Sequence, residues 1–180
     1  LGDAGEVSLM DARHALLLLD GVKVVPNNIT GSSGSCVVIS GPNAGGKTVA
    51  LKTAGLLGLM LAAGLPIPVS PDSRIGVPVK ILTDIGDDQS LIKNLSTFSA
   101  HMSNLAAILA EADKGSLVLL DELSAGTDPA EGAALAEALL DKLNEKGATT
   151  FSTTHFDSLK GRAQAGKGFV NAAVGFDIDE

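Results

Sequence analysis

The sequence predicts an α/β fold, a three-layer arrangement in which helices cover both faces of a mainly parallel sheet. Three observations support this class. Short apolar runs alternate along the chain with longer segments of helical periodicity. Residues 117–120 are all apolar, as expected of a strand that is buried on both faces. A glycine-rich turn separates the apolar run 36–40 from a predicted helix.

Length and composition favour a single domain over residues 1–180. The 180 residues are 45% hydrophobic, which is enough to bury one full core, and no linker-like stretch divides them. The chain starts with Leu1 and stops at Glu180 without a terminating device. We therefore expect it to be a piece of a longer protein.

Two strands and a long helix are expected near the start of the chain. The strands are residues 22–25 and 36–40, and the Asn, Gly and Ser residues within 26–34 form the turn between them. The helix occupies about residues 47–63, because Gly64 terminates it.

The middle of the chain adds a strand and a second helix. Four prolines make residues 66–78 irregular, and a strand at 79–83 follows. A helix capped by Ser96 or Thr97 continues to about Glu111 with an apolar stripe along one face. The stripe consists of Leu95, Phe98, Met102, Leu105 and Leu109.

The last third of the chain continues the alternation. After the strand at 117–120, Pro129 starts a helix that continues to about Glu145. Residues 149–153 form the next strand, and residues 169–176 add a further one.

Composition excludes several classes of function. The net charge of −8 indicates that this chain does not grip nucleic acid by itself, because such binding depends on Lys and Arg side chains that neutralise phosphates. Tyr and Trp are absent, which disfavours stacking of single-stranded bases. No run is long and apolar enough for a membrane span, and the start lacks a secretory pattern. The single cysteine, Cys36, is expected to be a small buried hydrophobe in a cytoplasmic protein.

A complete G-x-x-x-x-G-K-[ST] loop follows the strand at 36–40 and opens the next helix. Its residues are Gly41, Pro42, Asn43, Ala44, Gly45, Gly46, Lys47 and Thr48. The glycines allow backbone N–H groups to converge on phosphate oxygens, and the helix N-terminus adds partial positive charge. Lys47 supplies a full charge and Thr48 can ligate Mg²⁺. The loop predicts binding of a nucleoside triphosphate.

Two acids end the apolar strand at 117–120. Mg²⁺ coordination beside a phosphate-binding loop requires a carboxylate at the end of a buried strand, and Asp121 fits this role. Glu122 is placed to accept a hydrogen bond from an attacking water. A lone Asp-Glu pair is often only a solvated strand end, but the neighbouring loop favours the catalytic interpretation.

A histidine follows the strand at 149–153. Because parallel strands send their carboxyl ends to one crevice, His155 is expected near the nucleotide, where it could hydrogen-bond the γ-phosphate or the catalytic water. For His14 and His101 no such argument exists, and ordinary structural positions are expected.

The polar loop at 83–89 precedes a Ser-Thr pair at a helix start. The hydroxyls of Ser96 and Thr97, with unpaired N–H groups of the first turn, could form a second anion site. Local sequence explains the pair equally well as simple helix capping.

Together these motifs resemble the ATPase domain of the MutS family, a branch of the ABC-type P-loop NTPases. The resemblance covers about residues 13–155 and rests on the order and spacing of the P-loop, the acidic loop, Ser-Thr-Phe, Asp-Glu and Thr-His. Residues 82–89, 95–102 and 121–132 look like the MutS-two branch. Members of the mismatch-repair branch typically read Gly-Arg-Gly-Thr-Ser where this chain reads Leu-Ser-Ala-Gly-Thr-Asp at 123–128.

The resemblance implies a dimeric ATPase with nucleotides sandwiched between subunits. Ser96 and Thr97 would complete the partner's site, and Asp128 would lie in the loop that crosses the dimer. Many members stack an aromatic residue on adenine, whereas the matching place here offers Val24, Val25 and Asn27. Mg²⁺ and ATP or ADP are the implied cofactors.

The preferred hypothesis is an ATPase that drives conformational cycling of a homodimeric clamp on branched recombination DNA, with an anti-recombination role. The DNA would be held by parts outside these residues. A clamp on stalled or collided ribosomes is the alternative within the family. A nucleotide-dependent dimerisation switch with little turnover and a P-loop kinase come from other classes. Glu122 argues against the switch, and the acidic residues argue against the kinase.

Overall fold

In the computed structural model, the described residues are 2–3, 5–42, 45–86, 94–123, 128–154, 159, 161 and 168–175, with backbone alone for 94–98. The strands are β1 (Val7–Ala12), β2 (Asn27–Gly31), β3 (Cys36–Ser40), β4 (Arg74–Ile75), β5 (Lys80–Asp84), β6 (Ser116–Leu120), β7 (Thr149–Thr153) and β8 (Phe169–Ala173). The helices are α1 (Ala15–Leu19), α2 (Lys47–Ala62), α3 (Asn94–Glu111) and α4 (Pro129–Glu145).

Five parallel strands form the main sheet in the order β5-β6-β7-β3-β8. Phe151 of β7 lies opposite Val37 of β3 on one side and Leu119 of β6 on the other. Strands β2, β1 and β4 form a separate antiparallel sheet. The predicted α/β class with a mainly parallel sheet is confirmed.

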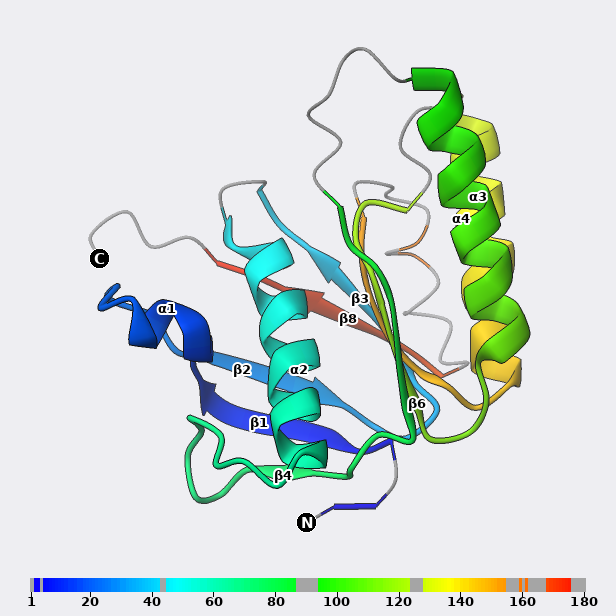
Figure 1. Cartoon of the computed structure of the whole chain (residues 1–180). Helices are drawn as coiled ribbons and strands as arrows, with labels where there is room; N and C mark the ends of the chain where they lie inside the picture. The colour runs from blue at the N-terminus through cyan, green and yellow to red at the C-terminus, as the bar shows by residue number, and fades with distance from the viewer. Residues whose placement is uncertain are drawn as a thin grey trace.

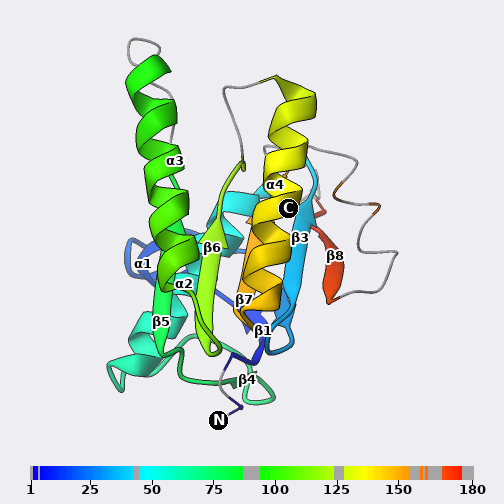
Figure 2. The ribbon, with the colours of Figure 1, turned by 90° about the vertical axis from the view of Figure 1, so that its right-hand side faces the viewer.

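Helices cover both faces of the main sheet, as Figure 1 shows. Helix α2 packs with the small antiparallel sheet on one face. Helices α3 and α4 lie side by side on the other face (Figure 2). Within the described residues, no helix has both the length and the apolarity needed to cross a membrane.

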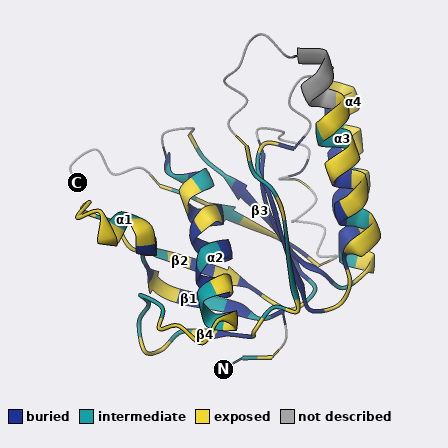
Figure 3. Ribbon diagram, viewed as in Figure 1, coloured by how far each residue is buried: buried dark blue, intermediate teal, exposed yellow. Residues whose placement is uncertain are grey.

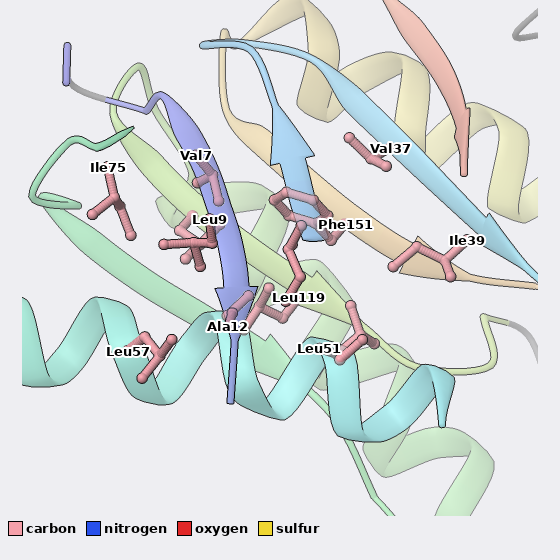
Figure 4. Packing of buried hydrophobic residues seen from close by; sticks show 14 of the residues in the cluster. Val7, Leu9, Ala12, Val37, Ile39, Leu51, Leu57, Ile75, Leu119 and Phe151 are labelled. Atoms are coloured by element: carbon pink, nitrogen blue, oxygen red, sulfur yellow. The ribbon is translucent and has the colours of Figure 1, made fainter. Parts of the chain in front are cut away.

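Alternate strand residues divide the core into two clusters, because successive side chains of a strand point to opposite faces. Val37 and Leu119 pack toward α2 with Phe151 (Figure 4), whereas Val38 and Leu120 pack toward α3 and α4. The outer surfaces of α3 and α4 are exposed (Figure 3). The main sheet is therefore held from both faces, which fixes the ends of its strands.

The single cysteine has the buried position that its sequence context predicted. Cys36 is fully buried in β3, and its Sγ lies 3.4 Å from the carbonyl oxygen of Leu140. Burial raises the pKa of the Cys36 thiol to about 11. The thiolate needed for nucleophilic chemistry is therefore disfavoured at neutral pH.

The prediction of a strand at residues 22–25 is wrong. Val22 and Val25 are half exposed, and the strand is instead β2, which lies within the predicted turn. β2 buries Ile29 and Gly31, and a side chain at Gly31 would approach the Phe151 ring to 2.8 Å. Contact with the main sheet selected this segment, because a valine-rich stretch that finds no partner gains nothing from strand propensity.

The remaining boundaries differ only slightly from those predicted. Helix α3 begins at Asn94, so Ser96 and Thr97 lie in its first turn and the predicted caps are wrong. Strand β5 is displaced by one residue, and β8 ends at Ala173. The sequence pattern did not predict β1, α1 and β4. The pairing of β1 is irregular at Asp11, which adopts a φ of 51°.

Leu140→Ala tests the core beneath α4. Leu140 is 0% exposed, so truncation leaves a cavity and should lower the free energy of unfolding by about 2–5 kcal/mol. The control is Leu135→Ala on the same helix, where Leu135 is 40% exposed and a loss of only ~0.5 kcal/mol is expected. Urea unfolding measures both, and equal losses would contradict the assignment of this core.

Candidate nucleotide site

The glycine-rich loop joins β3 to α2 with the backbone geometry that a phosphate cradle needs. Gly46 precedes α2 in a left-handed conformation with φ 78°, and a side chain built there would meet no atom of the described residues within 4 Å. Gly41 has φ 143°, and a side chain there would approach the Val174 carbonyl oxygen to 2.7 Å. Glycine is required at Gly41 by crowding and at Gly46 by backbone conformation. The N-terminus of α2 that follows Gly46 is the part of a helix that favours an anion.

Lys47 lies across the loop that precedes it. Its Nζ atom donates hydrogen bonds to the carbonyl oxygens of Gly41 at 2.8 Å and Pro42 at 3.0 Å. The residue is only 3% exposed, so its charge is concentrated at the loop. This arrangement places a cation at the N-terminus of α2, where anionic groups are already favoured.

The carboxylate of Asp121 accepts hydrogen bonds from two threonines. Thr48 Oγ1, in the first turn of α2, donates to Oδ2 at 2.7 Å. Thr153 Oγ1, at the end of β7, donates to Oδ1 at 2.6 Å. The two predicted magnesium ligands are therefore in direct contact, and both offer the oxygen atoms that Mg²⁺ prefers.

Thr153 also holds the backbone of Glu122. Its hydroxyl accepts a hydrogen bond from the Glu122 N–H at 2.8 Å. Glu122 has a φ of 48°, a left-handed conformation that is uncommon for any residue other than glycine. Such strain persists where the surroundings over-determine it, and it gathers at functional sites. One buried hydroxyl thus positions both acids after β6.

A cavity of about 310 Å³ opens beside the two acids. Its described walls include Asp121 and Glu122 together with Asp84 at the end of β5 and His101 and Asn104 of α3. The sequence had indicated the loop that begins near Asp84, but it assigned no role to His101, Asn104 or Thr153. The signal for Thr153 was its position at the carboxyl end of a parallel strand.

A second cavity, of about 280 Å³, lies between β2, β3, β8 and α2. Asn27, predicted to contact the base, lines it with Pro26, Ile39 and Ala50. Val24 and Val25 are not among the described residues of its wall. Asn27 nevertheless stays close to Val25, because its side-chain amide donates a hydrogen bond to the Val25 carbonyl oxygen at 3.2 Å. The contact of these residues with a base stays a prediction.

Comparison with known proteins identifies the family. The sequence profile described as MutS domain V matches residues 37–179. The chain belongs to the MutS family. The matched range includes the P-loop, both acids and all of α3, so these parts of the candidate site belong to domain V, whereas Asn27 precedes the matched range.

Curated relatives resemble the chain over almost its whole length. Endonuclease MutS2 of Enterococcus faecalis is 50% identical over 180 residues, which are 99% of this chain and 23% of that protein. Endonuclease MutS2 of Listeria monocytogenes is 51% identical with the same coverage. That of Caldanaerobacter subterraneus is 51% identical over 99% of this chain and 22% of its own length. The chain spans less than a quarter of these relatives.

The other predicted site residues of domain V have varied outcomes. Asp128 is the N-cap of α4, and its Oδ1 accepts a hydrogen bond from the Ala130 N–H at 2.9 Å. The backbone of Ser96 and Thr97 lies in the first turn of α3, but their side chains are outside the described residues. Asn43, Ala44 and His155 also lie outside them. The end of β7 does reach Asp121 through Thr153, two residues before His155.

Thr153→Val tests the hydroxyl between the two acids. Valine keeps the shape but removes both hydrogen bonds, so the Mg²⁺-dependent ATP hydrolysis that the sequence predicts for the complete protein should fall about 10–100-fold. Thr153→Ser, which keeps the hydroxyl, should stay close to the wild type. A steady-state phosphate-release assay compares the three proteins, and a fully active valine variant would refute the positioning role.

Proposed function

We propose that this chain is the ATP-hydrolysing domain of a MutS2-like dimeric clamp on branched DNA. The observation that carries the proposal is the network joining Thr48 and Glu122 through Asp121 and Thr153. It sets a magnesium-type ligand pair and a second carboxylate beside a P-loop. Membership of the MutS family, whose members are ATPases, supports the same conclusion.

Each residue of this network has a distinct role in the proposal. The N–H groups before α2 and Lys47 bind the phosphates, and Thr48 and Asp121 hold Mg²⁺. A Mg²⁺ ion held by these two residues would supply positive charge to offset the negative charge of the phosphates. Glu122 accepts a hydrogen bond from the attacking water and orients it. His155, which follows β7, contacts the γ-phosphate or that water.

The proposal includes a second subunit. One P-loop covers only one side of the γ-phosphate, and a helix N-terminus from a partner can supply donors on the other side. Helix α3 begins on the side of the sheet where β5 and β6 end (Figure 1), with Ser96 and Thr97 in its first turn. In the proposed dimer these residues complete the partner's site, and Asp128 lies at the crossing between subunits.

Charge favours a division of labour within the complete protein. The net charge of −8 gives this chain little attraction for phosphate backbones, so DNA contacts belong to other parts. The relatives are named endonucleases, which fits a nucleic-acid substrate for a longer protein. Neither these names nor the described residues favour the ribosome alternative. A clamp that cycles on branched DNA with an anti-recombination role is the function we propose.

Glu122→Gln tests hydrolysis against a binding switch. The amide keeps the shape but is a much poorer acceptor for the water proton, so kcat should fall at least about 10²-fold while ATP binding is retained. Phosphate release at saturating Mg²⁺-ATP and high protein concentration measures this. Equal, near-zero rates for the wild type and the variant would favour the switch.

Lys47→Ala is the matched control for this experiment. This variant lacks the charge that faces the phosphates, so its affinity for ATP should fall by about tenfold or more. A fluorescent ATP analogue measures the affinity. Unchanged affinity in this variant would contradict the assignment of the P-loop site.

Ser96→Arg tests the contribution to the partner's site. The bulky cation at the first turn of α3 should leave ATP affinity unchanged but block ATP-dependent dimerisation. Light scattering with and without ATP gives the mass, and Ser103→Ala on the same helix is the control. Normal ATP-dependent dimerisation by Ser96→Arg would contradict the proposal that Ser96 completes the nucleotide site of the partner subunit.

A further inference from the structure

Asp84 contacts Asp121 through its backbone and α3 through its side chain. Its backbone carbonyl oxygen accepts a hydrogen bond from the Asp121 N–H at 2.9 Å. Asp84 is the last residue of β5 and lies opposite Leu120 in the parallel register with β6. Any displacement of the Asp121 backbone therefore acts directly on Asp84.

The side chain of Asp84 is held by α3. His101 Nδ1 lies 2.6 Å from Oδ2, and Asn104 Nδ2 donates to Oδ1 at 2.8 Å. Asn104 also donates to the carbonyl oxygen of Thr83 at 3.3 Å. His101 and Asn104 are three residues apart and thus share one face of the helix. The Asp84 and His101 side chains are only 14% and 22% exposed, so water competes weakly for the contact between them.

The protonation behaviour of Asp84 agrees with this geometry. Burial alone would raise the pKa of the carboxyl group, but the close His101 imidazole and the hydrogen bond from Asn104 outweigh it and hold the pKa below its usual value. The carboxylate is thus the form that this part of α3 stabilises.

The far end of α3 is held separately, by one lysine of β5 and one at the end of α4. Lys80, at the start of β5, donates from Nζ to the Glu111 carbonyl oxygen at 3.0 Å, and Lys146 Nζ donates to that of Ala112 at 3.2 Å. These cations satisfy carbonyl groups at the C-terminus of the helix. The Asp84 contacts are the tie nearer the first turn, since Ser96 precedes His101 by five residues, or about 7.5 Å of helix.

We propose that Asp84, His101 and Asn104 form a positioning bridge that couples the Asp121–Glu122 site of one subunit to the α3 first turn presented to its partner. The bridge rests on the proposed function. It fixes the direction of α3 relative to β5 and β6, so the state of one nucleotide site sets how well α3 completes the other. His101 acts through Asp84 and touches no reacting atom.

The test uses two His101 variants in the complete protein. His101→Leu removes the donor but keeps apolar volume, whereas His101→Asn restores an N–H donor near the position of Nδ1. ATP affinity of the isolated subunit should change less than twofold in both. For His101→Leu, kcat at saturating ATP should fall about tenfold, as expected when catalytic groups are misplaced. The protein concentration at which half of the chains form the dimer should rise about tenfold. His101→Asn should recover most of both losses.

The pattern across variants separates a bridge from a general structural contact. Thermal unfolding checks that both variants fold, and Ser103→Ala, an exposed neighbour on α3, should behave as the wild type. Equal loss in the leucine and asparagine variants, or no loss in either, would overturn the bridge. A wild type that binds no ATP or does not hydrolyse it would overturn the proposed function and the bridge with it. Normal wild-type hydrolysis with unaffected variants would overturn the bridge alone.

Discussion

The sharing of one carboxylate by two hydroxyl groups is the constraint on which the site depends. Asp121 receives Thr48 from α2 and Thr153 from β7, so three elements distant in sequence must meet within hydrogen-bond distance. The strand order makes this possible, because β7 lies between β6 and β3 and β3 leads into the P-loop. A different order would leave the same residues at the sheet edge without bringing them together.

Two separate cores keep that order rigid. The cluster around Phe151 fixes α2 and the P-loop from one face, and the cluster around Leu140 fixes α3 and α4 from the other. The strand ends at Asp84, Asp121 and Thr153 form the boundary between the two. Closely packed interiors do not deform continuously, so polar contacts at such a boundary can relate the positions of the two faces.

Electrostatics and the family relationship point to the same kind of protein. The chain belongs to the MutS family, and its net charge is −8. Both observations fit the proposed division between an ATPase domain and DNA contacts made elsewhere. The negative charges around a nucleotide site repel the DNA phosphates less when the DNA is bound by a distant part of the protein. The acidic residues near the P-loop suit Mg²⁺ and water chemistry, and they contribute nothing to a DNA grip.

The sequence by itself determined the main-sheet fold and the P-loop with its two acids. These features are local: Gly41 to Thr48 are consecutive, and Asp121 directly ends an apolar strand, so residue types and spacing suffice. The helices at 47–62 and 129–145 were equally readable from periodicity and terminators. Family resemblance added the possible role of Ser96 and Thr97.

Only the tertiary structure decided the residues that depend on neighbours across the sheet. Thr153 reaches Asp121 because β7 pairs with β6, and His101 meets Asp84 because α3 packs on β5. The choice of β2 over residues 22–25 was also made by contact, since propensity favours the valine-rich segment but β2 packs against Phe151 through Gly31. Strand pairing and side-chain contact are properties of the folded chain, and no local pattern encodes them.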